Sequence, residues 1–294
     1  MEAFIVDAFT ETQFEGNRAG VVLDAGRMTA RQMQSVAAEI NASETAFLRN
    51  VDGNVYKIEY FTPTTAIDFC GHATVALFHM IAASGAISVT EGGAELLADT
   101  KAGLFEVTVT KQGERYFVQL AHDQPAQFAE LDENTTVSDV CSALKITDDS
   151  LDDSFPVKFG KTANWHLFVP VRSQSILDAI SYDSDLLSAI LSGAKAITAH
   201  VFCQSGDTYY VRNFGPHVGI VEDPATGSAA GAFGAYLIAE KLLPAENCRL
   251  KIIQGEAMGR PSQIDLQICC IDGVLRSVNV IGTAVASFKM SLLG

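Results

Sequence analysis

The chain has no long uninterrupted run of apolar residues and carries little positive charge. Its longest apolar stretches, such as Ala73–Ala83, include His positions and fall short of the roughly 20 residues that a membrane-spanning helix needs. Lys and Arg total 20 against 35 Asp and Glu, which gives a formal net charge of −15. Nucleic acids and anionic membranes require clustered Lys and Arg, so we expect neither as a partner. An anionic substrate would have to be held by local hydrogen-bond donors.

The six cysteines form no Cys-x-x-Cys pair, and no sequence motif of a metal site is present. Their irregular spacing in mostly apolar surroundings is typical of reduced, largely buried thiols. The first residues, Met1-Glu2-Ala3-Phe4, lack the basic start, long apolar run and cleavage site of a secretory signal. We therefore expect a cytoplasmic location.

With 294 residues and 48% hydrophobic residues, the chain can bury one large core or two smaller ones. Residue patterning predicts short strands separated by a few helices in both halves, with the acidic, turn-rich segment 121–155 crossing between them. The helices are expected at 29–40, 71–83, 137–144, 176–180, 185–191 and 229–241. The strands are expected at 4–9, 19–23, around 47, 56–61, 105–110, 116–120, 165–171, 199–203, 209–214, 251–254, 263–268 and 274–281.

A faint internal repeat links the two halves. Phe61-Thr62-Pro63 precedes Gly71 and a helix, and Phe214-Gly215-Pro216 precedes Gly227 and a helix. The two Phe-x-Pro units lie 153 positions apart and the two glycines 156 apart, so one gap of three aligns them. We interpret this as duplication, although two chance strand-loop-helix units would give the same pattern.

Both repeated units place glycine and a small polar residue where a loop enters a buried helix. The free backbone N–H groups at such a helix start, together with the positive end of the helix dipole, form a site for a carboxylate. Ordinary capping by Thr226 or Ser228 would explain either helix start alone. The occurrence of two such starts favours anion binding.

Four further residues are candidates for chemistry. Glu44 lies among small and apolar neighbours, so a partly buried carboxylate there can shuttle a proton, although most Glu residues are solvated. His72 at a helix start can orient or protonate a substrate, or simply pack. Asp223 can bind a substrate group or close a turn before Pro224. Cys70 is a candidate thiolate at a helix start or a buried structural thiol.

Six short segments are distributed from the first strand to beyond residue 254. They are Asp7-Ala8-Phe9 with Phe14-Glu15-Gly16-Asn17, Ser43-Glu44-Thr45-Ala46-Phe47, Phe61-Thr62-Pro63, Cys70-Gly71-His72-Ala73-Thr74, Glu222-Asp223-Pro224-Ala225-Thr226-Gly227-Ser228 and Gln254-Gly255. Each is weakly specific by itself, but six in this order are highly specific. Together they resemble the PhzF-like family of phenazine-biosynthesis-type isomerases, which shares its fold with diaminopimelate epimerase.

The resemblance implies an α+β fold of two pseudo-symmetric domains, each a curved, mostly antiparallel sheet wrapped around a central helix. We expect an N-terminal domain of residues 1–120 completed by 282–294, and a C-terminal domain of residues 121–281. The resemblance also implies an active site in the cleft between them, no metal or organic cofactor, and a homodimer that binds a small anionic metabolite.

The family's catalytic residues fall on Glu44 as general acid and base, supported by His72, Asp223 and Ser228. Six further residues are expected to contact the substrate, some of them through backbone donors. They are Asn17, Ser43, Gly71, Ala73, Thr226 and Gly227. Arg18 departs from the family pattern because many relatives resemble Gly-Asn-Pro at this point, which puts the identity of the substrate in doubt.

Three functions are consistent with these residues. The first is an isomerase in which Glu44 removes a proton from an acidified carbon and returns it elsewhere. The second is a two-base epimerase or racemase; in the fold's epimerase relatives both bases are cysteines, whereas Cys70 aligns with Thr226 in the repeat, which disfavours this version. The third is a metabolite-binding protein without turnover.

Overall fold

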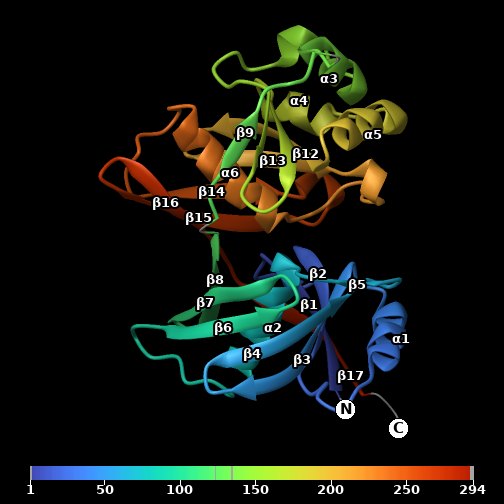
Figure 1. Ribbon diagram of the computed structural model, residues 1–294, viewed down its shortest axis with the longest axis vertical. Helices are drawn as coiled ribbons and strands as arrows, with labels where there is room; N and C mark the ends of the chain where they lie inside the picture. Colours follow the sequence, from blue (N-terminus) through green and yellow to red (C-terminus); the bar gives the residue numbers. More distant parts are fainter. Residues whose placement is uncertain (1, 123, 134, 292–294) are drawn as a thin grey trace. The chain divides into compact units, whose positions relative to one another are not determined.

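The computed structural model of the chain describes residues 2–122, 124–133 and 135–291. It divides into two compact units, one formed by Met1–Ala121 with Ile281–Gly294 and the other by His122–Val280. The division expected from the sequence, at 120/121 and 281/282, differs from this by one residue at each boundary. Each unit is described separately below (Figure 1).

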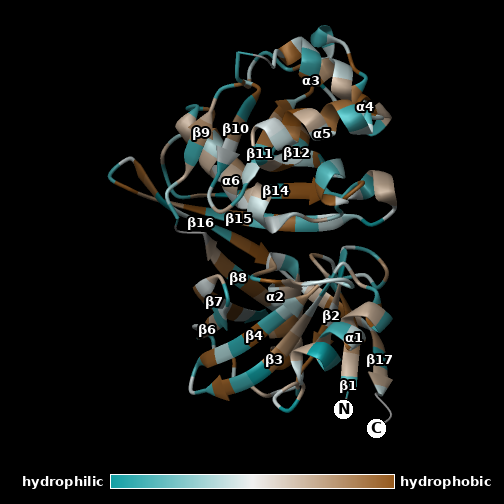
Figure 2. Cartoon of the chain, turned by 45° about the vertical axis from the view of Figure 1, so that its right-hand side comes forward, coloured by the Kyte–Doolittle hydropathy of each residue, from teal (hydrophilic) through white to brown (hydrophobic). Residues whose placement is uncertain are grey.

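The first unit is a mostly antiparallel sheet around one buried helix. Its strands pair in the order β17, β1, β2, β3, β4, β6, β7 and β8, with β5 beside β4, and only β2/β3 and β4/β6 are parallel among the pairs described. The strands are β1 (Glu2–Ala8), β2 (Asn17–Val22), β3 (Glu44–Asp52), β4 (Val55–Phe61), β5 (Ala66–Ile67), β6 (Ala94–Thr100), β7 (Gly103–Gln112), β8 (Arg115–His122) and β17 (Ala284–Ser291). Burial alternates along most of β4 because successive side chains point to opposite faces, and Figure 2 shows hydrophobic and hydrophilic residues along this strand.

Two helices accompany this sheet. Helix α2 (Gly71–Ala83) contacts β1, β2, β3, β7 and β17, and most of its side chains are buried. Helix α1 (Ala30–Ile40) packs instead on the outside, against β3 and β4. Thr29 caps α1 in a reciprocal capping box with Gln32, and Asn41 ends it in the left-handed conformation.

The second unit repeats the same order of strand pairings. Its sheet runs β9, β10, β11, β12, β13, β14 and β15, and again two pairs, β11/β12 and β13/β14, are parallel. The strands are β9 (Gln127–Ala129), β10 (Lys158–Lys161), β11 (Trp165–Pro170), β12 (Ala196–Ser205), β13 (Thr208–Phe214), β14 (Cys248–Gln254), β15 (Ser262–Ile271) and β16 (Val274–Gly282). The buried helices α2 and α6 (Gly227–Ala239) occupy equivalent places, after the β3/β4 and β12/β13 hairpins, which agrees with duplication.

Helix α6 begins and ends two residues earlier than the expected range 229–241. Gly227 and Ser228 are poor residues for a helix interior, yet they form the first turn, where the packing of the helix in this unit outweighs intrinsic propensity. At the other end Glu240 is the C-cap and Lys241 has a φ of 59°, which leaves the helical region. The partly buried start of α6 therefore includes Gly227 and Ser228, two of the residues expected at the ligand site.

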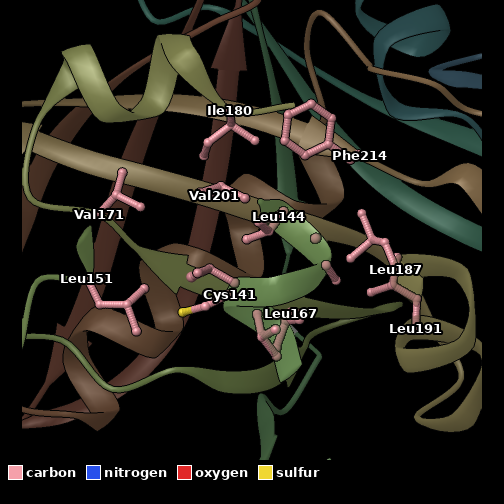
Figure 3. Close-up of a cluster of buried hydrophobic side chains, with 14 of the residues drawn as sticks. Cys141, Leu144, Leu151, Leu167, Val171, Ile180, Leu187, Leu191, Val201 and Phe214 are labelled. Atoms are coloured by element: carbon pink, nitrogen blue, oxygen red, sulfur yellow. The ribbon is translucent and has the colours of Figure 1, made fainter. Parts of the chain in front are cut away.

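A second apolar core of this unit lies among α3 (Val137–Leu144), α4 (Gln174–Ala179), α5 (Ser184–Gly193), β11 and β12. Figure 3 shows Leu144 of α3 near Val201 of β12, with Leu187 and Leu191 of α5 beside them. Three short 3-10 turns complete the described elements, at Asp148–Ser150, Pro216–Val218 and Glu256–Met258. In the described residues, none of the helices combines the length and the apolar character needed to cross a membrane.

Candidate active site

Glu44 is the first residue of β3 and enters the sheet directly after the turn that ends α1. The parallel pairing of β3 with β2 sets Glu44 opposite Ala19. Its side chain keeps 21% of its surface exposed, so the carboxylate is shielded but still reachable. This is the partly buried position expected for a proton shuttle.

His72 is the second residue of α2 and lies against Glu44. Its Nε2 atom is 3.3 Å from Oε2 of Glu44 and 3.3 Å from Oγ of Ser43, while its side chain is only 9% exposed. The Sγ atom of Cys70, at the N-cap of α2, lies 3.4 Å from Nδ1 of the same ring. The structure therefore brings together Ser43, Glu44 and His72, as expected, and adds Cys70.

The hydrogen bonds around the imidazole assign its tautomer. Ser43 has one hydroxyl proton, which it donates to the carbonyl oxygen of Arg18 at 3.2 Å. The Oγ atom of Ser43 is then an acceptor toward His72, so Nε2 carries the ring hydrogen. Nδ1 is left as the acceptor for the thiol of Cys70. The ring thus links the thiol on one side with the carboxylate on the other.

A buried pair of hydroxyl groups fixes the first turn of α2. Thr74 Oγ1 donates to the carbonyl oxygen of Cys70 at 2.7 Å and lies 2.6 Å from the hydroxyl of Tyr60. Burial raises the pKa of Tyr60 far above its usual value, so this phenol is neutral. The sequence did not identify Tyr60 and Thr74 as supports of the site. The usable signal was a polar residue at an otherwise apolar position, Thr74 in a predicted helix and Tyr60 in a predicted strand.

Gly71 and Ala73 belong to the same helix start. The first α-helical rung runs from the N–H of Thr74 to the carbonyl of Cys70, so the helix does not use the N–H groups of residues 71–73. Ala73 is fully buried, and a Cβ at Gly71 would meet only Leu120 Cδ1 at 4.0 Å. Gly71 is partly exposed and has no side chain, so its contact with a ligand would involve the backbone.

Asn17 and Arg18 begin β2, next to the strand that carries Glu44. Asn17 is 3% exposed and follows Gly16, whose φ of 65° and close approach to the Ala8 carbonyl require glycine. The guanidinium of Arg18 donates to the carbonyl oxygen of Asn41 at 2.6 Å. Arg18 therefore stabilises the turn between α1 and Glu44, a role that its sequence position did not reveal.

In the second unit, Asp223 and Thr226 meet at the start of α6. Thr226 Oγ1 donates to Oδ2 of Asp223 at 2.5 Å and accepts from Asn213 Nδ2 at 2.9 Å and from Gln254 Nε2 at 3.0 Å. The N–H of Thr226 donates to Oε1 of Gln254 at 3.3 Å. The hydroxyl expected to contact substrate is therefore engaged inside this unit, where it orients the carboxylate of Asp223.

Gly227 and Ser228 form the first turn of α6, and both are partly buried. The first helical rung runs from the N–H of Ala230 to the carbonyl of Thr226. The helix itself thus does not use the N–H groups of residues 227–229. These donors occupy the same helical positions as those at the start of α2.

A buried chain of polar side chains supports Asn213. Thr198 Oγ1 donates to Asn213 Oδ1 at 2.9 Å, and His166 Nδ1 lies 2.8 Å from Thr198 Oγ1. His200 Nδ1 is 3.3 Å from Asn213 Oδ1, and burial lowers the pKa of His200 to about 4. Sequence reasoning gave these residues and Gln254 no supporting role, although polar residues at buried strand positions were a usable signal.

Cys70 and Thr226 hold the same position in their units, the N-cap of the buried helix, and neither makes a side-chain capping bond. The structural equivalence supports the alignment made from the repeat. A pair of cysteines at these two positions is therefore absent. The two units carry different chemistry at equivalent places: a carboxylate with imidazole and thiol in the first, and a carboxylate held by hydroxyl and amide groups in the second.

Known proteins match almost the whole chain. The family model described as phenazine biosynthesis-like protein, PhzC-PhzF, matches residues 6–290. The uncharacterized isomerase YddE of Escherichia coli K12 is 34% identical over 291 residues, covering 98% of this chain and 96% of the relative. The trans-2,3-dihydro-3-hydroxyanthranilate isomerase of Pseudomonas chlororaphis is 30% identical over 262 residues, covering 88% of this chain and 87% of the relative.

Solved structures give the same result for the fold. A Bacillus anthracis phenazine biosynthesis protein of the PhzF family has a TM-score of 0.89 and 25% identity, covering 100% of this chain and 99% of its own. A hydroxyproline epimerase of Agrobacterium vitis has a TM-score of 0.63 and 13% identity, covering 99% of this chain and 91% of its own. This likeness concerns the fold alone. The expected α+β fold of the diaminopimelate-epimerase type is confirmed. The chain belongs to the phenazine biosynthesis-like PhzF family and is an isomerase.

Proposed function

We propose that this isomerase moves a proton between two carbon atoms of a small carboxylated metabolite, with Glu44 as the acid and base and without a cofactor. The observation that supports the proposal is the position of the Glu44 carboxylate, 21% exposed and 3.3 Å from Nε2 of His72. A carboxylate that is shielded yet reachable can accept a proton from one carbon, exchange it with solvent, and deliver a proton to another carbon.

His72 serves the carboxylate in two ways. Its Nε2–H donates toward Oε2 of Glu44 and holds the carboxylate in one orientation. The same ring accepts from Cys70 at Nδ1, which keeps the tautomer fixed. Ser43 completes the arrangement because its hydroxyl bridges the ring and the backbone of Arg18.

The starts of α2 and α6 are the proposed anion-binding groups. Proton removal beside a carboxylate or conjugated system builds negative charge on oxygen, and backbone N–H groups at a helix start stabilise such charge. In this proposal residues 71–73 and 227–229 supply these donors, Ser228 adds a hydroxyl, and Asp223 binds a donor group of the metabolite.

The substrate class is inferred from chemistry and from one relative. A net charge of −15 gives the chain no general attraction for anions, so local donors must select the substrate. The relative named trans-2,3-dihydro-3-hydroxyanthranilate isomerase acts, by its name, on a carboxylated ring. We propose an unsaturated carboxylic acid of similar size for this chain.

The epimerase alternative has less support. Two-base epimerisation needs opposed acid and base groups, and the two equivalent N-cap positions hold Cys70 and Thr226. Thr226 is a hydroxyl that already donates to Asp223, so it is a poor base. The likeness to a hydroxyproline epimerase concerns the fold alone.

Deuterium exchange tests the proposal directly. The protein and its Glu44→Gln variant are incubated in heavy water with unsaturated cyclic and linear carboxylic acids, and products are followed by NMR. We expect the wild type to place deuterium at a new carbon while the double bond moves, and the variant to be slower by roughly 10²–10⁴-fold. A Glu44→Gln rate equal to that of the wild type would remove Glu44 as the base. Deuterium uptake without movement of the double bond would favour the epimerase. No deuterium uptake from any of the acids would favour a binding protein.

A further inference from the structure

Three potential metal ligands of different chemistry meet in the first unit. A carboxylate oxygen of Glu44, the sulfur of Cys70 and a ring nitrogen of His72 all lie within 4.8 Å of one another. The separations are 3.3 Å from Nε2 to Oε2, 4.0 Å from Nε2 to Sγ and 3.4 Å from Nδ1 to Sγ. No sequence motif predicted this group, because Glu44 begins a strand while Cys70 and His72 begin a helix.

We infer that Glu44, Cys70 and His72 bind a zinc-like divalent cation, and that the bound ion inhibits the enzyme. Tetrahedral zinc with bonds of roughly 2.0–2.2 Å to nitrogen and oxygen and about 2.3 Å to sulfur needs N···O near 3.3 Å and N···S near 3.5 Å. The N···O separation already matches, whereas the sulfur lies nearer Nδ1 than Nε2 and within 4.8 Å of the carboxylate oxygen, so both the N···S and the O···S separations must shorten to about 3.5 Å. In this proposal a change of the Cys70 χ1 rotamer carries the sulfur from the Nδ1 side of the ring toward Nε2 and Glu44.

The donor set selects the class of metal. Thiolate and imidazole prefer zinc, cobalt and similar ions, whereas magnesium and calcium prefer sites built only from oxygen. Three protein ligands leave a fourth position for water. Binding needs Nε2 as the ligand, so the ring hydrogen moves to Nδ1, and the thiol loses its proton to solvent. One proton is therefore released for each ion bound.

Inhibition follows from the atoms that the ion would occupy. The metal takes a lone pair of the Glu44 carboxylate and the Nε2 atom that otherwise donates to it, so neither is available for proton transfer. This second part rests on the proposed function, whereas metal binding itself does not. The two parts are therefore tested by separate readouts.

The binding test uses metal alone. Co²⁺ is titrated into the full chain and followed by its thiolate charge-transfer absorption, and Zn²⁺ affinity is measured by competition with a metallochromic dye. We expect one high-affinity equivalent, release of one proton, and no binding of Mg²⁺ at the same concentration. Cys70→Ser and His72→Asn should each weaken Zn²⁺ by at least about tenfold, since even loss of outer-shell partners costs roughly 10–100-fold.

A matched control addresses the other thiols. Cys269 and Cys270 are partly exposed neighbours that offer an alternative site, so the Cys269→Ser/Cys270→Ser double variant should bind as the wild type does. Retention of the cobalt band in Cys70→Ser, or its loss in the double variant, would overturn the proposed site. Circular dichroism checks that each variant is folded.

The inhibition test uses the deuterium-exchange assay, with each protein compared to its own metal-free rate. Zn²⁺ should suppress exchange by the wild type at the concentration that saturates the dye-competition site, and Cys70→Ser should need at least about ten times more. Binding without inhibition would overturn the inhibitory role, and stimulation would make the ion a catalytic one instead. If no exchange is found with any acid, the proposed function fails while the binding result stands.

Discussion

Nε2 of His72 lies 3.3 Å from Oε2 of Glu44, although one residue begins a helix and the other begins a strand. The contact depends on two local features. The left-handed Asn41 ends α1 and returns the chain to β3, and the Thr74 hydroxyl fixes the first turn of α2 through the Cys70 carbonyl. The geometry of the pair is therefore set by groups that do not touch the reacting atoms.

Shortening Glu44 tests how strictly this geometry matters. In Glu44→Asp the carboxylate keeps its charge but recedes by about one methylene group from His72. Misplacement of a reacting group by about 1 Å costs roughly 10²-fold, so we expect kcat in the exchange assay to fall by that factor. Glu39→Asp, an exposed position on α1, is the matched control and should leave kcat unchanged. Equal rates for Glu44→Asp and the wild type would contradict a positioned base.

Removing the Thr226 hydroxyl tests the support of Asp223. Thr226→Val has the same shape but leaves Asp223 without one donor and Asn213 and Gln254 without their shared acceptor. Buried polar groups that lose a partner cost about 1–3 kcal/mol each, so urea unfolding should show a loss of at least about 1 kcal/mol. Thr226→Ser keeps the hydroxyl and should retain most of the stability. A stable Thr226→Val protein would show that the network contributes little.

Thr45 and Thr74 offer a contrasting pair of fully buried threonines. In the described part of the chain the Thr45 hydroxyl has no hydrogen-bond partner, whereas the Thr74 hydroxyl has two. We expect Thr45→Val to raise the free energy of unfolding by about 1 kcal/mol, because it removes an unsatisfied polar group. Thr74→Val should lower it by about 1–3 kcal/mol. Chemical denaturation of both variants measures these changes in the free energy of unfolding. A change of the same sign in both variants would refute the contrast between a satisfied and an unsatisfied hydroxyl.

The buried His200 makes the stability of the second unit depend on pH. Burial lowers its pKa from 6.5 to about 4, so the unfolded chain binds more protons between these values. Stability is therefore fully present above about pH 6.5 and declines as the pH falls toward 4, by up to about 3 kcal/mol. His200→Phe keeps a ring beside Phe168 and Phe233 and should remove this part of the pH dependence. The denaturation midpoints of the wild type and of His200→Phe, measured from pH 7 to 4, show the difference in pH dependence. The same pH dependence in both proteins would contradict the prediction.

Much of the fold followed from local patterns. The period of apolar residues predicted the 71–83 helix with the bounds of α2, and the repeated Phe-x-Pro and glycine spacing corresponds to the repeated strand order. The start of α6 was placed two residues late because Gly227 and Ser228 are weak helix formers in isolation. Tertiary burial of the helix start, which no local pattern reports, decided that boundary.

The candidate site was predicted less completely than the fold. Ser43, Glu44 and His72 were identified and are brought together, but Cys70 was left open between a thiolate and a structural thiol, and Arg18 was noted only as a departure from the family pattern. The structure shows the Cys70 thiol against the imidazole and the Arg18 guanidinium on a backbone carbonyl. Such contacts join residues that are far apart in the sequence. They could not be predicted because they depend on where the start of a helix packs against the start of a strand.

Residue type and order were enough to establish the family, the duplicated architecture and the chemical identity of the candidate acid and base, because these are read directly from the chain. The groups that support them became visible only in the folded protein. Thr226 turned out to hold Asp223, Thr74 to hold the turn below His72, and Cys70 to join Glu44 and His72 in a potential metal site. The physical reason is that hydrogen bonds and metal coordination act over about 2–3.5 Å, a scale set by packing and not by order along the chain.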